Sequence, residues 1–238
     1  MGRIFLTGDM HAALDDRRRK FISKLDPSDI LIVLGDFGYT WTPLRLQGYK
    51  APCMTLLVDG NHDNFSYLDA CLDEEMFGST VKKVKDNVYR LMTGNIYEIN
   101  GLKFFVFGGA LSIDKEQRIP YVSWWPEEIP SKRVVDKALD TLNARGGEVD
   151  FMLSHTCPEQ TAVDMFRYPY KIEDPVEKML SVMEYEIESR KGKMVDNFFG
   201  HHHENMSDGV HTCLYGDVVE IMEDGSWEYA VKGKEFAL

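Results

Sequence analysis

The sequence lacks three patterns that would each assign it to a special class of protein. Its four cysteines include no Cys-x-x-Cys pair, which fits neither a zinc knuckle nor a disulfide-dense secreted scaffold. It contains no apolar stretch that approaches the length of a membrane span. Its first residues show no charged segment followed by a long apolar one, as a secretion signal would. We therefore expect reduced thiols, a cytoplasmic location and no membrane partner.

An excess of basic residues is also missing. The chain has 27 lysines and arginines against 39 aspartates and glutamates, a formal charge of −12. Proteins that grip nucleic acid usually present a broad basic surface, so nucleic acid is not favoured as a partner. The basic run from Arg17 to Lys20 lies on a predicted helix, and we interpret it as a solvated helix face. Any affinity for phosphate must be local, and bound cations would supply it.

The 238 residues, 44% of them hydrophobic, are consistent with one domain over residues 1–238. Short apolar runs alternate with longer amphipathic ones, which predicts an α/β fold. Predicted strands are Arg3–Thr7, Ile30–Leu34, Cys53–Val58, Ile96–Ile99, Lys103–Phe107, Phe151–Ser154, Asn197–Phe199, Thr212–Tyr215 and Val218–Met222. Predicted helices are Ala13–Leu25, Ser66–Leu72, Lys132–Ala144 and Pro175–Arg190. The stretch Leu111–Pro130 has no clear period and is predicted to be a long ordered loop.

Five short segments carry the residues of chemical interest, and each follows a predicted strand. Because ligands gather at the carboxyl ends of strands in α/β sheets, we expect the five to converge. The segments are Gly8-Asp9-Met10-His11, Gly35-Asp36, Gly60-Asn61-His62-Asp63, Ser154-His155 and Gly200-His201-His202-His203.

The side chains in these segments are typical ligands for transition metals. Asp9 and His11 are two residues apart, and an extended backbone would send both toward one ion. Carboxylate, imidazole and amide groups without thiolates suit Mn, Fe, Zn or Ni. The set is too large for one such ion, and a shared carboxylate, for which Asp36 is the natural candidate, would let it hold two. His202 would then point away from its neighbours, and His211 is expected to be an ordinary surface residue.

Taken in this order, the blocks resemble the calcineurin-like metallophosphoesterase superfamily over roughly residues 8–203. The resemblance implies a four-layer fold with two mixed β-sheets in a sandwich flanked by helices. It implies hydrolysis of phosphomonoesters or phosphodiesters by a metal-bridging hydroxide, with His62 assisting the leaving group. The implied first metal site is Asp9, His11, Asp36 and His203, and the implied second site is Asp36, Asn61, His155 and His201.

Two departures from the superfamily's motifs argue against the protein serine/threonine phosphatase branch and leave the set of metal ligands intact. Protein serine/threonine phosphatases of the superfamily continue the second block as Gly-Asp-x-Val-Asp-Arg-Gly, whereas this chain has Phe37 to Trp41 there. Ala12 also stands where many members have glycine. The region from Gly108 to Pro126 is similar to a small group of bacterial and phage-associated metallophosphoesterases.

Substrate contacts and alternative functions depend on the predicted loop. Arg118, Trp124 and Trp125 are candidate substrate-binding residues. The two tryptophan rings could stack on a base, and an equally good interpretation is that they pin the loop to the body of the protein. An alternative function is therefore that of a nuclease or cyclic-nucleotide phosphodiesterase. An alternative of another class is a catalytically inactive binding or scaffold module on the same fold. The sequence indicates neither the natural ester nor the oligomeric state.

Overall fold

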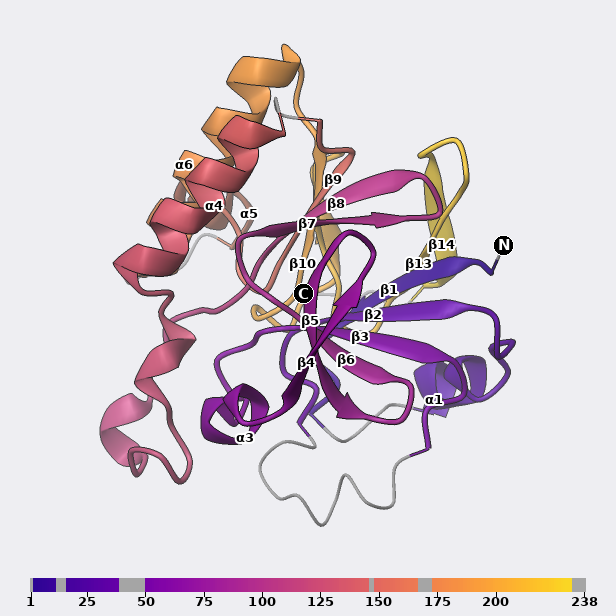
Figure 1. Cartoon of the computed structure of the whole chain (residues 1–238), viewed down its shortest axis with the longest axis horizontal. Helices are drawn as coiled ribbons and strands as arrows, with labels where there is room; N and C mark the ends of the chain where they lie inside the picture. Colours follow the sequence, from indigo (N-terminus) through magenta and orange to yellow (C-terminus); the bar gives the residue numbers. More distant parts are fainter. Residues whose placement is uncertain (1, 12–15, 39–49, 146–147, 167–172, 233–238) are drawn as a thin grey trace.

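The computed structural model describes residues 2–11, 16–38, 50–145, 148–166 and 173–232. Two β-sheets lie against each other in this part of the chain, and helices cover their outer faces (Figure 1). The fold class predicted from the sequence, α/β with two mixed sheets flanked by helices, is confirmed.

The first sheet has the strand order β14-β13-β1-β2-β3-β6-β5-β4. Its strands β1, β2, β3 and β6 are parallel, and the strands outside them are antiparallel to their neighbours. The bounds are β1 (Ile4–Gly8), β2 (Ile30–Leu34), β3 (Met54–Val58), β4 (Leu72–Met76), β5 (Ser79–Lys85), β6 (Val88–Leu91), β13 (Val218–Ile221) and β14 (Trp227–Val231).

The second sheet has the order β11-β12-β10-β9-β8-β7. Strands β12, β10, β9 and β8 are parallel, while β11 and β7 run antiparallel at its two edges. The bounds are β7 (Asn95–Ile99), β8 (Leu102–Phe107), β9 (Phe151–Ser154), β10 (Asp196–Phe199), β11 (Met206–Ser207) and β12 (His211–Cys213).

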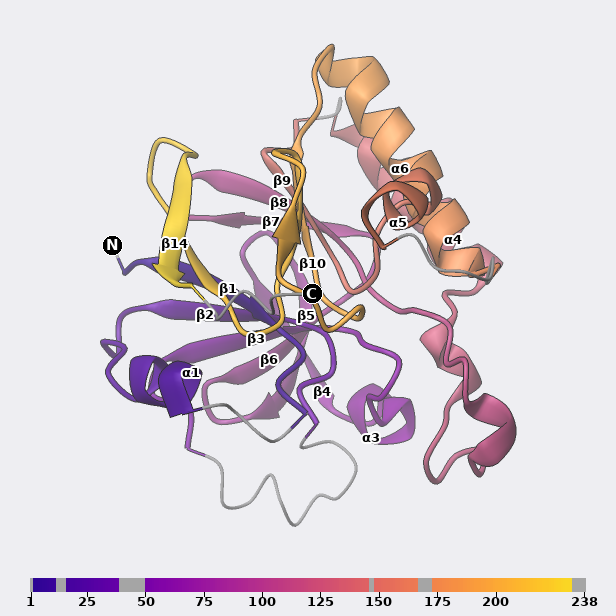
Figure 2. The same ribbon diagram turned by 180° about the vertical axis from the view of Figure 1, so that it is seen from behind.

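The alternation of side chains along the central strands builds the layers. In β2, Ile32 and Leu34 join a core cluster that contains residues of both sheets, whereas Leu31 and Val33 belong to the cluster on the outer face. Both faces are covered, which is why this parallel strand is apolar throughout. The outer helices of the first sheet are α1 (Asp16–Ile22) and α3 (Phe65–Asp69), and those of the second are α4 (Lys132–Ala144), α5 (Glu159–Phe166) and α6 (Pro175–Lys191) (Figures 1 and 2).

No described helix is both long and apolar enough to cross a membrane. The longest described helix, α6, begins at a proline behind the N-cap Asp174 and ends at Gly192, which adopts a left-handed conformation. Both are standard helix boundaries, and they make α6 predictable from the sequence.

Elements with mostly half-exposed side chains were not predicted. The strands β4, β5 and β6 form a meander at one end of the first sheet, and the edge strand β4 carries Asp73, Glu74 and Glu75. The side chains of β4 and β5 are mostly half-exposed, so these strands lack the apolar run that marks a buried strand. Strand β6 is buried but has only four residues. The short strands β11 and β14 and the helix α5 were missed for similar reasons. Of the predicted helix from Ala13 to Leu25, α1 occupies the middle, and residues 13–15 lie outside the described part.

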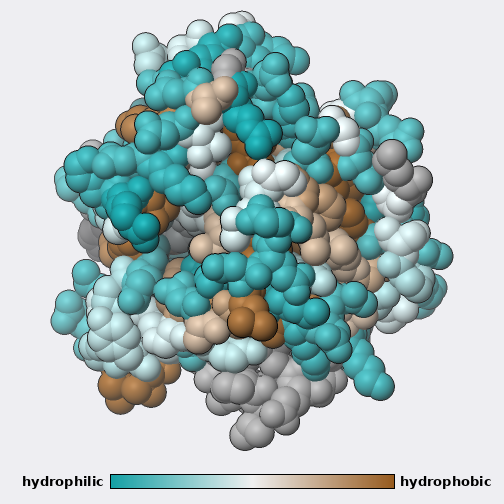
Figure 3. Space-filling view, in the orientation of Figure 1, coloured by the Kyte–Doolittle hydropathy of each residue, from teal (hydrophilic) through white to brown (hydrophobic). Residues whose placement is uncertain are grey.

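The predicted long loop is ordered, and we call residues 111–130 the 111–130 segment. It contains only two short 3₁₀ turns, η1 (Lys115–Gln117) and η2 (Pro126–Glu128). Near one end, the backbone N–H of Leu111 donates to the N-cap Asp174 of α6 at 2.9 Å. The turn-rich middle exposes Ile113, Ile119 and Val122, and the lobe at the lower left of Figure 3 is apolar on its outside.

His211 contradicts its expected place on the surface. Its side chain is buried on β12, where Nε2 lies 2.7 Å from Glu184 of α6 and Nδ1 lies 2.8 Å from Asp208. Although burial opposes the charged imidazole, these two carboxylates raise the pKa of His211. The ring therefore links α6 to the second sheet, and its protonated form strengthens the link.

We predict that replacing His211 with Gln destabilises the protein in a pH-dependent manner. Because the pKa of His211 is raised on folding, its contribution is complete below its unfolded pKa of about 6.5 and is lost as pH rises through the folded value. The loss in unfolding free energy should therefore be larger at about pH 6 than at about pH 9, in urea titrations.

The groups that face His211 are Glu184 and Glu188 on α6 and Asp208 on the turn before β12. Glu184→Gln should remove most of the same pH dependence. An equal loss of stability for His211→Gln at both pH values would contradict the charged link.

Candidate metal centre

The predicted convergence of the five segments is confirmed. Three of them follow the adjacent parallel strands β1, β2 and β3 of the first sheet, and two follow the adjacent parallel strands β9 and β10 of the second. Parallel neighbours end at the same edge of a sheet, so the segments meet where the two sheets join.

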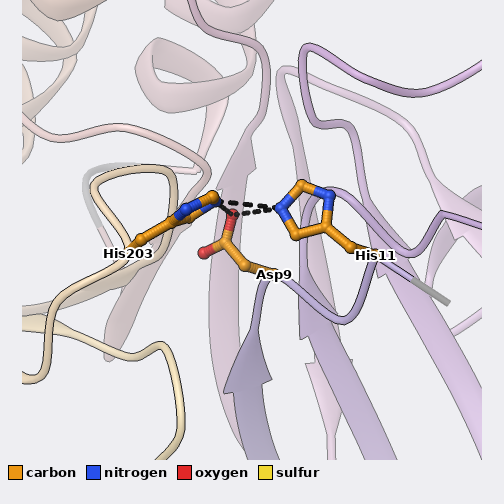
Figure 4. Close-up of side chains that lie close together, drawn as sticks. All are labelled: Asp9, His11 and His203. Atoms are coloured by element: carbon orange, nitrogen blue, oxygen red, sulfur yellow. Dashed lines mark hydrogen bonds and ion pairs between the residues drawn. The ribbon is translucent and has the colours of Figure 1, made fainter. Parts of the chain in front are cut away.

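The first group of side chains consists of Asp9, His11 and His203 (Figure 4). The Nε2 atoms of the two histidines lie 2.9 Å apart. Oδ1 of Asp9 is 3.8 Å from Nε2 of His11 and 3.6 Å from Nε2 of His203. One carboxylate and two imidazoles thus point at a common position, which is the arrangement of a metal site.

The second group surrounds the amide oxygen of Asn61. Its Oδ1 lies 3.0 Å from Nε2 of His155 and 3.1 Å from Nδ1 of His201. Nδ1 of His155 is 2.8 Å from the carbonyl oxygen of Leu34. A hydrogen bond to this carbonyl keeps a proton on Nδ1 and leaves Nε2 to face Asn61, as a ligand imidazole requires.

Asp36 lies between the two groups and contacts both. Its Oδ2 is 3.7 Å from Nε2 of His11, and its Oδ1 is 3.5 Å from Nε2 of His155. Oδ1 also accepts the backbone N–H of His62 at 2.8 Å. The structure therefore places Asp36 where the sequence predicted a shared carboxylate.

The predicted backbone conformation was wrong. We expected Asp9 and His11 on extended chain, but both have a φ of 42°, and Asp36, His201 and His203 have φ values of 51°, 65° and 56°. All five therefore adopt left-handed conformations, which are uncommon for non-glycine residues and are concentrated at functional sites. Sharp left-handed turns bring these side chains together, and not the alternation of side-chain direction along an extended strand.

Glycines beside the turns permit the close approach. At Gly35, where φ is 83°, an added Cβ would lie 2.1 Å from Nδ1 of His155. At Gly200 it would lie 2.3 Å from Oδ2 of Asp9. A side chain at either position would push away a residue of the centre.

The buried charges of the centre fit bound cations. Oδ1 of Asp9 is buried and makes no hydrogen bond within the described part of the chain, which is costly for a carboxylate. Burial and the nearby charge of Asp36 raise the pKa of Asp9 to about 8. Burial would also raise the pKa of Asp36, but the charge and hydrogen bond of His155 hold it below its usual value. Two carboxylates, an amide oxygen and four imidazoles suit Mn, Fe, Zn or Ni.

The two groups differ in their access to solvent. The side chains of His11 and His203 are 29% and 48% exposed, whereas His155 is fully buried. The ring of His203 stacks on Tyr215 with centroids 4.7 Å apart. The first group is therefore the open side of the centre, from which a substrate can approach.

His62 and Arg118 lie together beside the centre, although 56 residues separate them in the sequence. Nε2 of His62 is 3.8 Å from Oδ2 of Asp36. Nη1 of Arg118 lies 2.5 Å from Nδ1 of His62, and Nη2 of Arg118 forms an ion pair with Asp114 at 2.8 Å. Burial lowers the pKa of His62 to about 4, with the charge of Arg118 acting in the same direction and that of Asp36 opposing it. The 111–130 segment thus brings a cation to the edge of the candidate metal site.

The two tryptophans of the segment lie in different environments. Trp125 is 1% exposed, and its Nε1 donates to Ser66 of α3 at 2.8 Å. A buried ring with this bond cannot stack on a substrate, so Trp125 instead anchors the segment. Trp124 is half-buried, and its role in substrate binding stays a prediction.

Two further residues near the centre were misjudged or missed. Arg18, assigned to a solvated helix face, is 3% exposed and donates to the carbonyl oxygen of Gly8 at 2.6 Å, directly beneath Asp9. His202 belongs to neither metal group, but it does not point away from its neighbours: its ring packs edge-on against His201, with centroids 5.1 Å apart, and stacks on Phe166, with centroids 3.9 Å apart. Nothing in the basic run from Arg17 to Lys20 indicates that the side chain of Arg18 is buried.

The sequence model of the family described as calcineurin-like phosphoesterase matches residues 2–205, which include every candidate ligand. No curated protein gives a significant match. A similar solved structure is that of a phosphopantetheinyl hydrolase from Mycobacterium tuberculosis, with 15% identity, 90% of each chain covered and a TM-score of 0.44.

We predict that Asp36→Asn weakens metal binding at both groups, because its carboxylate faces both. His203→Asn should weaken binding at the first group alone. After loading with Mn²⁺ and gel filtration, elemental analysis should find about one ion per chain in His203→Asn and fewer in Asp36→Asn, since lost ligands reduce affinity strongly.

Asp73→Asn, at an exposed carboxylate of β4, is the matched control and should keep the wild-type metal content. Wild-type metal content in Asp36→Asn would rule out a shared carboxylate.

Proposed function

The chain belongs to the calcineurin-like phosphoesterase family and is a metal-dependent phosphoester hydrolase, and we propose that it works with two metal ions on either side of Asp36. The observation that supports this proposal is the position of Asp36, whose two oxygens face separate groups of ligand side chains. The first ion would be held by Asp9, His11, Asp36 and His203, and the second by Asp36, Asn61, His155 and His201.

The ions would be Mn, Fe, Zn or Ni. When bound, such a pair supplies Lewis-acid polarisation of the phosphate and an activated water nucleophile. With only two carboxylates in the ligand set, the loaded site carries net positive charge and attracts an anionic ester despite the acidic chain. The protein side chains then have to orient the ester and assist the leaving group.

His62 is the group that assists the leaving group in this proposal. A guanidinium only donates hydrogen bonds, so the 2.5 Å contact with Arg118 makes Nδ1 of His62 the acceptor. The ring proton is then on Nε2, which lies 3.8 Å from Oδ2 of Asp36 and farther from Arg118, at 3.4 Å from Nη2. From Nε2 the ring can donate a hydrogen bond to the leaving oxygen and stabilise its developing negative charge.

Arg118 binds a non-bridging oxygen of the phosphate in this proposal. It is part-buried beside His62, and the ion pair with Asp114 and a hydrogen bond to the carbonyl oxygen of Ser123 hold it in place. Arginine binds phosphate oxygens strongly because its donors form a planar fork. Phosphomonoesters and phosphodiesters both have non-bridging oxygens, so p-nitrophenyl phosphate and its bis ester are the first substrates to assay.

We predict that His62→Asn lowers kcat by about 10²- to 10³-fold on the better of the two esters, the usual range for losing one hydrogen-bond donor to a developing charge. Metal content should not change, because His62 is not among the proposed ligands. Measuring kcat together with elemental analysis of the Mn²⁺-loaded protein tests this. A full kcat in His62→Asn would remove the leaving-group role, and an inert metal-loaded wild type would remove the proposed hydrolysis of these esters.

We predict that Arg118→Gln raises KM by about ten- to a hundredfold, since a hydrogen bond to a charged group contributes about 1.5–3 kcal/mol. Arg118→Lys keeps the charge and should lose less. The control is Lys115→Gln, which removes an exposed positive charge from the same segment. Equal effects of Arg118→Gln and Lys115→Gln on KM would show that only the general charge of the segment matters.

A further inference from the structure

The amide of Asn61 can serve the centre in only one of its two orientations. Its oxygen faces His155 and His201. Oxygen and nitrogen of a side-chain amide have nearly the same size, so a half-turn about the last bond costs little in packing. After such a turn the NH₂ group, which cannot bind a cation, would face the second metal position.

Ser112 provides the partner for the NH₂ group. Nδ2 of Asn61 donates to Oγ of Ser112 at 3.0 Å, across 51 residues of sequence. A serine hydroxyl can either donate or accept, so this contact alone does not select the orientation of the amide. The direction of the hydroxyl decides it.

Glu128 sets that direction. Its Oε2 lies 2.6 Å from Oγ of Ser112, and its Oε1 accepts the backbone N–H of Ser112 at 2.9 Å. A carboxylate accepts hydrogen bonds, so the Ser112 hydroxyl donates to Glu128 and offers its lone pairs to Asn61. Ser112 is 2% exposed and Glu128 is fully buried, which keeps water from replacing either contact.

We propose that Ser112 and Glu128 are positioning residues for the second metal ion. They fix the amide of Asn61 with its oxygen toward His155 and His201, and they do not touch the ion or the substrate. The inference rests on the proposed metal centre. It also gives a purpose to a fully buried carboxylate, since burying such a group is otherwise costly.

The test measures metal binding in Ser112→Ala, which removes the acceptor for Asn61. We expect the affinity for Mn²⁺ at the second position to fall by about 10- to 100-fold, the usual effect of losing a partner of a ligand. Titration of the protein with Mn²⁺ should then show one ion bound as in the wild type and one bound more weakly. The double variant Ser112→Ala/His203→Asn should bind both ions weakly, because His203 belongs to the first group alone. This result would show that Ser112→Ala by itself affects the second position.

Two further variants separate orientation of the amide from general packing. Ser112→Thr keeps the hydroxyl and should restore tight binding of both ions. Glu128→Gln keeps the size of the side chain but places an NH₂ group near Ser112, and it should weaken the second site like Ser112→Ala. Ser79→Ala, which removes a part-buried serine hydroxyl bonded to Ile96 at 2.7 Å, is the matched control and should bind both ions normally.

Thermal unfolding in chelator shows which variants are folded, and only those are titrated. Wild-type affinity for both ions in folded Ser112→Ala, or in folded Glu128→Gln if Ser112→Ala does not fold, would overturn the proposal. Because metal binding is measured without any ester, this outcome is distinct from failure of the proposed hydrolysis.

Discussion

The repulsion between two buried carboxylates, Asp9 and Asp36, is the constraint on which the rest of the centre depends. Both side chains are almost fully buried at the join of the two sheets, where water cannot screen their charges. The imidazole of His155 holds one of them ionised, and an oxygen of the other makes no hydrogen bond among the described residues. Positive charge relieves this repulsion, and cations bound there explain how an acidic chain can attract a phosphate.

The parallel order of β1, β2 and β3, and of β9 and β10, is what brings these charges together. The sequence predicted this arrangement because every block of ligands followed an apolar strand, and burial on both faces makes such strands easy to recognise. The meander from β4 to β6 was missed, because β4 and β5 carry charged, half-exposed side chains and β6 is only four residues long. The inward turn of Arg18 and the burial of His211 were also missed, since both depend on contacts with residues that are distant in sequence.

Local conformation was the part of the site that sequence spacing described least well. The two-residue spacing in Asp9-x-His11 was correctly linked to a common target, but the reason given was wrong. Left-handed turns and neighbouring glycines direct the side chains. Such turns are imposed by tertiary packing, because an isolated aspartate or histidine disfavours them. The role of Trp125 as an anchor likewise required its partner, Ser66, to be known.

The 111–130 segment has buried residues at its two ends and exposed apolar residues between them. Its flanks carry Ser112 and Glu128, which are buried, while the stretch between them exposes Ile113, Ile119 and Val122 to solvent. Substitutions at these exposed positions can therefore accumulate during evolution without disturbing Asn61 or Arg118. A lineage of such enzymes can thus change the outer surface of the segment while the buried contacts that hold the centre are inherited unchanged.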